Sequence, residues 1–133
     1  MNNRILIVHK GRFDQFPPLI SVKCALNNLG FSVDVMTTEI ERTNLIARDE
    51  KVIIIPKSKI PIIGIFVWYL RFLYKFKYIS RRNYDYVWIE GGDTLALFGI
   101  FLNIHPKSKF IIQISELYDS WPMYKFLIGL SIQ

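Results

Sequence analysis

The chain has 133 residues, a formal net charge of +6 and an apolar fraction of 51%. This length fits one domain, and the apolar fraction is too high for a disordered chain. Cys24 is the single cysteine, so it cannot form an intrachain disulfide, and we interpret it as a small packing residue on a helix. The charge is uneven, because residues 57–82 hold seven basic residues and no acidic one. This excess favours anionic partners: phosphate groups, acidic lipid headgroups or nucleic acid.

The first predicted elements are a strand and a helix. Ile5–Val8 is a short, β-branched apolar run without alternation, which is typical of a buried strand. Pro18–Leu29 predicts an amphipathic helix, because proline suits a first turn and Gly30 follows as a C-terminal stop. Lys23 and Asn27 fall on another face of this helix. Its apolar positions at helical spacing are Leu19, Val22, Leu26 and Leu29.

Strand and helix patterns then continue in alternation. Ser32–Met36 completes a strand–helix–strand unit, whose strands we expect to be parallel with a right-handed crossover. Residues 37–50 are polar and predict a loop with a short helix. The alternation indicates an α/β fold with an open, mainly parallel sheet of about five strands and helices on both faces. Later strands are predicted at Val52–Ile55, Tyr84–Glu90 and Lys109–Ile114, with helices at Thr94–Asn103 and towards Gln133.

The basic segment contains a long uncharged run, residues 60–70. It is a weak candidate for a spanning helix, because Pro61 stands at one end and basic residues interrupt before about twenty apolar residues accumulate. As an amphipathic helix it has two interpretations. It could cover the sheet with its other face in solvent, or it could lie on an anionic membrane with its aromatic side down. The membrane interpretation assigns this surface to Trp68, Arg71, Phe72, Lys75, Phe76 and Arg82.

Motif arguments exclude several kinds of site. A dinucleotide fingerprint needs three glycines in G-x-G-x-x-G, whereas the loop HKGRFDQFPP after the first strand has Gly11 alone. The chain has no G-x-x-x-x-G-K-[ST] motif, which excludes a P-loop ATPase. His9, Cys24 and His105 do not have the spacing of zinc ligands, so we expect no metal site.

The loops after three predicted strands carry the candidate ligand-binding residues. In open parallel sheets, ligands bind outside the carboxyl ends of the strands, where the strand order reverses. Glycines at 91 and 92 would let backbone amides approach a ligand, and a buried carboxylate could act as a general base towards a hydroxyl. Asp93 could instead cap a helix, and the other carboxylates could be ordinary solvated side chains. The candidate catalytic residues are Glu90, Asp93 and Glu116, and the candidate substrate-binding residues are His9, Lys10, Gly11, Arg12, Gly91, Gly92 and Asp119.

Four segments in order resemble a known family. They are RILIVHKG, LGFSVDVMT, YDYVWIEGGDTLALFG and KSKFIIQISELYD. Over residues 5–119 they resemble the N-terminal, acceptor-side domain of GT-B-type glycosyltransferases, in the large retaining group that builds bacterial polysaccharides and glycolipids. The resemblance implies a Rossmann-like half of a GT-B fold, with Gly11 near a bound sugar and residues 90–93 on the cleft floor. Ser115 stands where the family often has a histidine before an acidic residue, here Glu116.

The resemblance also implies a function shared with a second domain. A GT-B enzyme closes two Rossmann-like domains around a cleft, and the second supplies most of the nucleotide-sugar site. We therefore expect residues 1–133 to form a single N-terminal domain, incomplete at its C-terminus, that binds the acceptor and is inactive alone. No cofactor is expected on this chain, and a nucleotide-sugar donor only with a second domain. The expected partners are a lipid-linked or oligosaccharide acceptor, an anionic membrane surface, and a missing C-terminal domain or partner subunit.

The remaining expectations concern location and competing functions. The resemblance implies a cytoplasmic protein, peripheral at the inner face of the membrane. A non-catalytic α/β binding domain of receiver or flavodoxin type is the alternative, although a receiver needs acidic residues where this chain has His9 and Lys10. The charge also permits a nucleic-acid binder, but the basic residues lie beside an apolar face without a recognisable reading motif. We expect no nucleic-acid partner.

Overall fold

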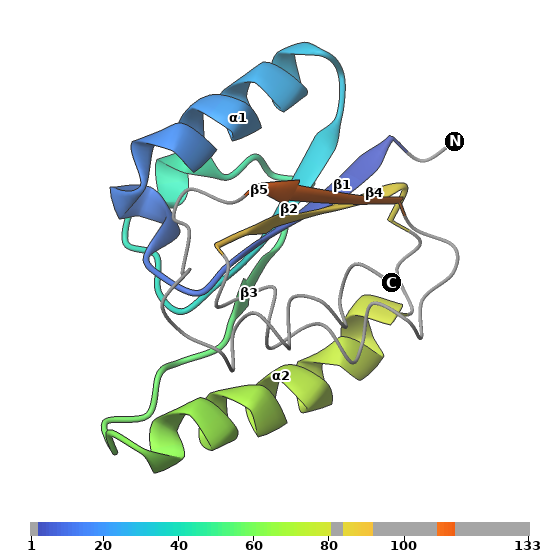
Figure 1. Cartoon of the computed structure of the whole chain (residues 1–133). Helices are drawn as coiled ribbons and strands as arrows, with labels where there is room; N and C mark the ends of the chain where they lie inside the picture. Colours follow the sequence, from blue (N-terminus) through green and yellow to red (C-terminus); the bar gives the residue numbers. More distant parts are fainter. Residues whose placement is uncertain (1–2, 81–83, 92–108, 114–133) are drawn as a thin grey trace.

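Five parallel strands form one open sheet in the computed structural model, which describes residues 3–80, 84–91 and 109–113 (Figure 1). Their order across the sheet is β3-β2-β1-β4-β5. This confirms the predicted α/β class and parallel sheet, and the order is that of a Rossmann-like fold. Flavodoxins and receivers have the order 2-1-3-4-5, which differs from the order in this chain. The strands are β1 (Arg4–His9), β2 (Ser32–Thr37), β3 (Val52–Ile54), β4 (Tyr86–Glu90) and β5 (Lys109–Gln113).

Two helices cover opposite faces of the sheet, as Figure 1 shows for α1 and α2. The first is α1 (Pro17–Asn28) and the second is α2 (Ile63–Ser80). Short 3₁₀ turns, η1 (Phe13–Gln15) and η2 (Thr43–Leu45), lie in the connections that follow β1 and β2. None of the described helices has both the length and the apolar character that crossing a membrane requires.

The ends of α1 follow the predicted signals. Its first two residues are prolines. Proline has no amide proton, and this costs no hydrogen bond in the first turn, where backbone amides have no intrahelical partner. Gly30 adopts φ +88°, and the chain reverses there with the Phe31 amide donating to the carbonyl of Leu26. Two expectations for this helix are corrected. Leu29 is 73% exposed, because it caps the helix beyond the packed face, and Cys24 is exposed rather than packed.

Each face of the sheet has its own apolar core, because side chains alternate along a strand. On the α1 face the buried residues are Ile5, Ile7, Phe13, Leu19, Val33 and Val35. On the α2 face they are Leu6, Val8, Met36, Ile53, Ile55, Trp68, Phe72, Tyr84, Val87 and Ile89. The two helices are therefore held to the sheet by separate clusters, one per face.

The aromatic side of α2 faces the sheet. Trp68 is 2% exposed and Phe72 is fully buried, and their rings stack with centroids 5.8 Å apart. The expectation that these two residues meet a membrane is wrong, since they are occupied by core packing. Arg71 and Lys75 are exposed, as expected. The side chain of Phe76 and all of Arg82 lie outside the described residues.

Buried ionic groups lie at the amino-terminal ends of the strands, which we call the amino-terminal edge of the sheet. Lys23, expected on the polar face of α1, is buried and donates to Glu50 at 2.5 Å. Glu50 also accepts from the amides of Val33 and Ala47 at 2.9 Å each. Nearby in the sheet, the buried Asp34 accepts from the Tyr84 hydroxyl at 2.7 Å. These contacts tie α1 and the segment before β3 to the sheet, so polar groups at this edge serve the fold.

Candidate ligand site at the carboxyl edge

The strand order reverses between β1 and β4. From β1 the chain builds outwards through β2 and β3 on one side, and then returns to place β4 and β5 on the other. Ligands of open α/β sheets bind outside the carboxyl ends of the strands at such a point. The last residues of the two strands are register partners, His9 opposite Glu90. Since register partners in parallel strands share a face, both side chains leave the same face of the sheet.

His9 and Glu90 form a close pair at this point. The imidazole Nδ1 lies 2.6 Å from Oε2 of Glu90, and the two side chains are 13% and 7% exposed. The ring of Phe16 stacks on the imidazole at a centroid distance of 4.9 Å. An ionised carboxylate can only accept a hydrogen bond, so Nδ1 carries the proton when Glu90 is ionised. In the neutral imidazole this leaves Nε2 as an acceptor, the nitrogen available to a ligand hydroxyl.

Gly11 lies against the free edge of the imidazole. A Cβ atom built on Gly11 would fall 2.6 Å from Nε2 of His9, which is closer than real contacts of this kind. The carbonyl of Gly11 is held by the end of β2: it accepts from the hydroxyls of Thr37 at 2.5 Å and Thr38 at 2.8 Å. The Thr37 hydroxyl in turn accepts from the amide of Phe13 at 3.1 Å. The loop after β1 is thereby positioned by its neighbour strand rather than by glycines.

An ion-pair group orders the outer part of the same loop. Arg12 contacts Glu41 at 3.1 Å and Asp14 at 3.6 Å. The amide of Glu41 donates to the buried carboxylate of Asp14 at 2.9 Å, and this bond lowers the pKa of Asp14 although burial opposes the shift. The Arg42 amide adds a second bond at 3.2 Å. Arg12, predicted to bind substrate, is thus held by two carboxylates of its own chain.

The structure brings together part of the predicted site. His9, Lys10, Gly11 and Glu90 lie at the carboxyl ends of β1 and β4. Gly91 follows Glu90 with φ +94°, and its amide donates to the carbonyl of Gln113 at 3.0 Å, so this amide joins β4 to β5. The predictions for Gly92, Asp93, Glu116 and Asp119 lie outside the described residues.

Three contributing residues were not among the predicted site residues. Phe16 stacks on His9, and Thr37 and Thr38 hold the Gly11 carbonyl. The position of the threonines at the end of the second strand of a βαβ unit is a usable signal, because the carboxyl ends of parallel strands share one edge. Among the described residues, no group of three or more His, Cys, Asp or Glu side chains could hold a metal ion.

Comparison with known proteins supports the fold alone. No family model matches the chain, and no curated protein matches it. Among solved structures, the chain is similar to the C-terminal domain of a hydrogenase from Pyrococcus furiosus, with a TM-score of 0.59 and 14% sequence identity. The match covers 84% of this chain and 90% of that domain. At this identity the likeness establishes a shared Rossmann-like α/β architecture.

Proposed function

We propose that this chain is the acceptor-binding part of a glycosyltransferase that transfers a sugar from a nucleotide-sugar to a polysaccharide or lipid-linked acceptor. The observation that carries the proposal is the His9–Glu90 pair, joined at 2.6 Å where the strand order reverses. The order and spacing of the four segments that resemble GT-B-type glycosyltransferases support the same assignment.

The pair suits a hydroxyl-bearing ligand. In this proposal Nε2 of His9 accepts a hydrogen bond from an acceptor hydroxyl, and Glu90 is the positioning residue that holds the tautomer and ring orientation. Phe16, stacked on one imidazole face, restricts ring rotation. The absence of a glycine-rich fingerprint after β1 agrees with a sugar rather than a dinucleotide at this loop.

The test follows the imidazole signals of ¹³C-histidine-labelled protein during titration with alkyl glycosides, using His105→Asn to assign the two histidines. We expect the glycosides to shift the His9 signals. Glu90→Gln should weaken binding about tenfold, because the bond to a charged acceptor is lost. Asp49→Asn, at the opposite edge of the sheet, is the matched control and should bind normally. Glycosides that leave His9 unmoved, or that bind Glu90→Gln equally well, would contradict the proposal.

A non-catalytic binding domain predicts a different result in a second measurement. If the chain is combined with a donor-binding domain of a GT-B-type glycosyltransferase and a nucleotide-sugar, a transferase forms a new glycosidic bond, whereas a binding domain retains the glycoside unchanged. Mass spectrometry of the glycoside separates the two outcomes.

A further inference from the structure

The outer side of α2 exposes a stripe of large apolar residues. Ile63, Phe66, Leu70 and Tyr74 are 54–82% exposed and recur three or four positions apart, so they share one face of the helix. This face is opposite to Trp68 and Phe72, which pack on the sheet. The loop before α2 extends the surface with Ile60 and Ile62, at 52% and 80% exposed. We call these six residues the α2 stripe.

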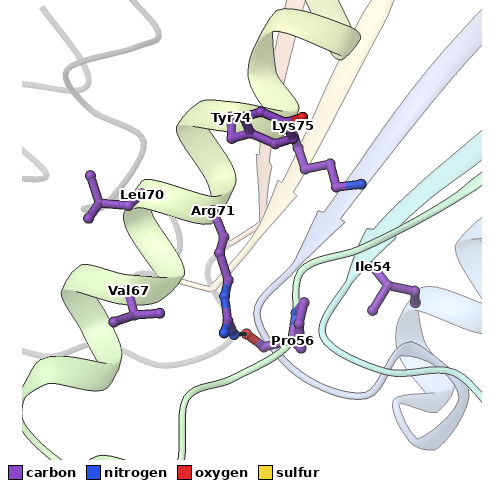
Figure 2. Close-up of a pocket in the computed structure, with 7 residues that line it drawn as sticks. All are labelled: Ile54, Pro56, Val67, Leu70, Arg71, Tyr74 and Lys75. Carbon is purple, nitrogen blue, oxygen red and sulfur yellow. Dashed lines mark hydrogen bonds between the residues drawn. The ribbon is translucent and has the colours of Figure 1, made fainter.

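A groove runs along one side of the α2 stripe. Figure 2 shows it between the end of β3 and the middle of α2. Its volume is about 500 Å³. Its walls are mainly apolar, and Arg71 and Lys75 stand at its border. The Arg71 guanidinium donates to the carbonyl of Pro56 at 2.6 Å, which holds the helix to the chain leaving β3. The residues that line the groove are Ile54, Pro56, Val67, Leu70, Arg71, Tyr74 and Lys75.

The charge beside the α2 stripe has one sign. Residues 57–82 carry seven basic residues and no acidic one, and Lys57, Lys59, Arg71 and Lys75 are exposed. An exposed apolar surface bordered by lysine and arginine matches an anionic bilayer, whose headgroups meet the cations while the apolar side chains enter the interface. A protein partner would have to supply an acidic rim and an apolar centre of the same shape.

We propose that the α2 stripe docks this protein on an anionic phospholipid surface, with Phe66 and Leu70 inserted and the exposed lysines before α2, Lys57 and Lys59, on the headgroups. The docking face is the side of α2 opposite to the one that sequence periodicity suggested. The proposal rests on exposure and charge and does not depend on the glycosyltransferase assignment.

The test measures sedimentation of the protein with vesicles of phosphatidylcholine, with or without phosphatidylglycerol. We expect binding only when phosphatidylglycerol is present, and weaker binding at high salt because exposed charges are screened. Phe66→Ser with Leu70→Ser should abolish binding, whereas Leu29→Ser, at the exposed apolar residue that follows α1, should not change it. Lys57→Gln with Lys59→Gln should weaken binding about tenfold or more, and Arg42→Gln with Arg48→Gln is the matched charge control.

A fluorescence measurement distinguishes insertion from loose adsorption. An environment-sensitive dye is attached at Phe66→Cys, or at Leu29→Cys as control, in a Cys24→Ser background. We expect a blue shift with anionic vesicles from the dye at position 66 alone. Equal binding to both vesicle types, an unaffected Phe66→Ser/Leu70→Ser protein, or a dye that stays in water would each overturn the proposal. Conversion of a dimer to a monomer by the stripe substitutions, without vesicle binding, would assign the stripe to a second copy of the chain.

Discussion

At the scale of single residues, Gly11 has a steric role in the candidate site. It precedes η1 without the positive φ that marks Gly30 and Gly91. What distinguishes it is the imidazole of His9, whose Nε2 lies 2.6 Å from the position that a Cβ would take. Any side chain at position 11 would therefore compete with a ligand for the free nitrogen of His9.

Gly11→Ala should displace the imidazole, because His9 is already held by Glu90 on one side and Phe16 on its face. We expect overpacking of this kind to lower the free energy of unfolding by about 1–3 kcal/mol. The glycoside-dependent shift of the His9 signals should disappear at the same time. Urea unfolding and the NMR titration measure the two effects.

Gly30→Ala provides the matched glycine control. Its Cβ would meet no atom within 4 Å, but its φ of +88° disfavours alanine. We therefore expect a stability loss of about 1 kcal/mol with unchanged His9 signals. If Gly11→Ala left both the stability and the His9 signals unchanged, the steric role would be wrong.

Sequence patterns located His9 and Glu90 separately but could not pair them. Each stands at the end of an apolar run that predicts a strand, so the sequence places both at the carboxyl ends of the strands. Their contact depends on β4 lying beside β1 in register, a long-range fact that local periodicity does not contain. The same reason explains Lys23, whose burial depends on Glu50, a partner 27 positions away.

At the scale of elements, α2 is apolar on two opposite sides. Trp68 and Phe72 pack on the sheet while Phe66 and Leu70 face outwards. Periodicity can find a helix with apolar faces, but it cannot decide which face the sheet takes when both are apolar. By contrast, the sequence predicts both ends of α1, because the signals there are local. The prolines at its start lack amide protons that would be unpaired in a first turn, and Gly30 after its end permits a positive φ.

Two phenylalanines of α2 should respond very differently to truncation. Phe72→Ala removes a fully buried ring that stacks on Trp68, so we expect a loss of about 3–5 kcal/mol in the free energy of unfolding. Phe66→Ala removes a ring that is 68% exposed, and the change should stay within about 0.5 kcal/mol. Urea unfolding followed by circular dichroism measures both, and equal losses would contradict the orientation of α2.

At the scale of the whole molecule, the two edges of the sheet have different roles. The amino-terminal edge buries Asp34 and the Lys23–Glu50 pair in closed hydrogen-bond networks. The carboxyl edge holds the His9–Glu90 pair between loops. The hydrogen-bond network at the amino-terminal edge and the candidate site at the carboxyl edge therefore use different polar groups.

Acid should destabilise the protein through Asp14 and Glu50. Burial by itself would raise the pKa of Glu50, but the hydrogen bond from Lys23 and those from backbone amides bring its pKa below the usual 4.5. The pKa of Asp14 lies below its usual 3.8, chiefly through the Glu41 amide. A carboxyl whose folded pKa is depressed stabilises the fold above its unfolded pKa, and this contribution is lost as the pH falls through the folded value. Urea unfolding should give constant stability from about pH 7 to 5 and a decline below.

Replacing Glu50 separates its share of this pH dependence from the rest. Glu50→Gln removes a titrating group and leaves the Lys23 ammonium buried without its counter-charge, so we expect a loss of about 3–5 kcal/mol at pH 7 and a flatter acid decline. Adding Lys23→Met should recover part of the loss, because the uncompensated charge is removed. Glu39→Gln, an exposed carboxyl, is the control and should match the parent protein. If Glu50→Gln lost as much stability in acid as the parent protein, other carboxyls would account for the pH dependence. The Lys23–Glu50 pair would then not stabilise the amino-terminal edge.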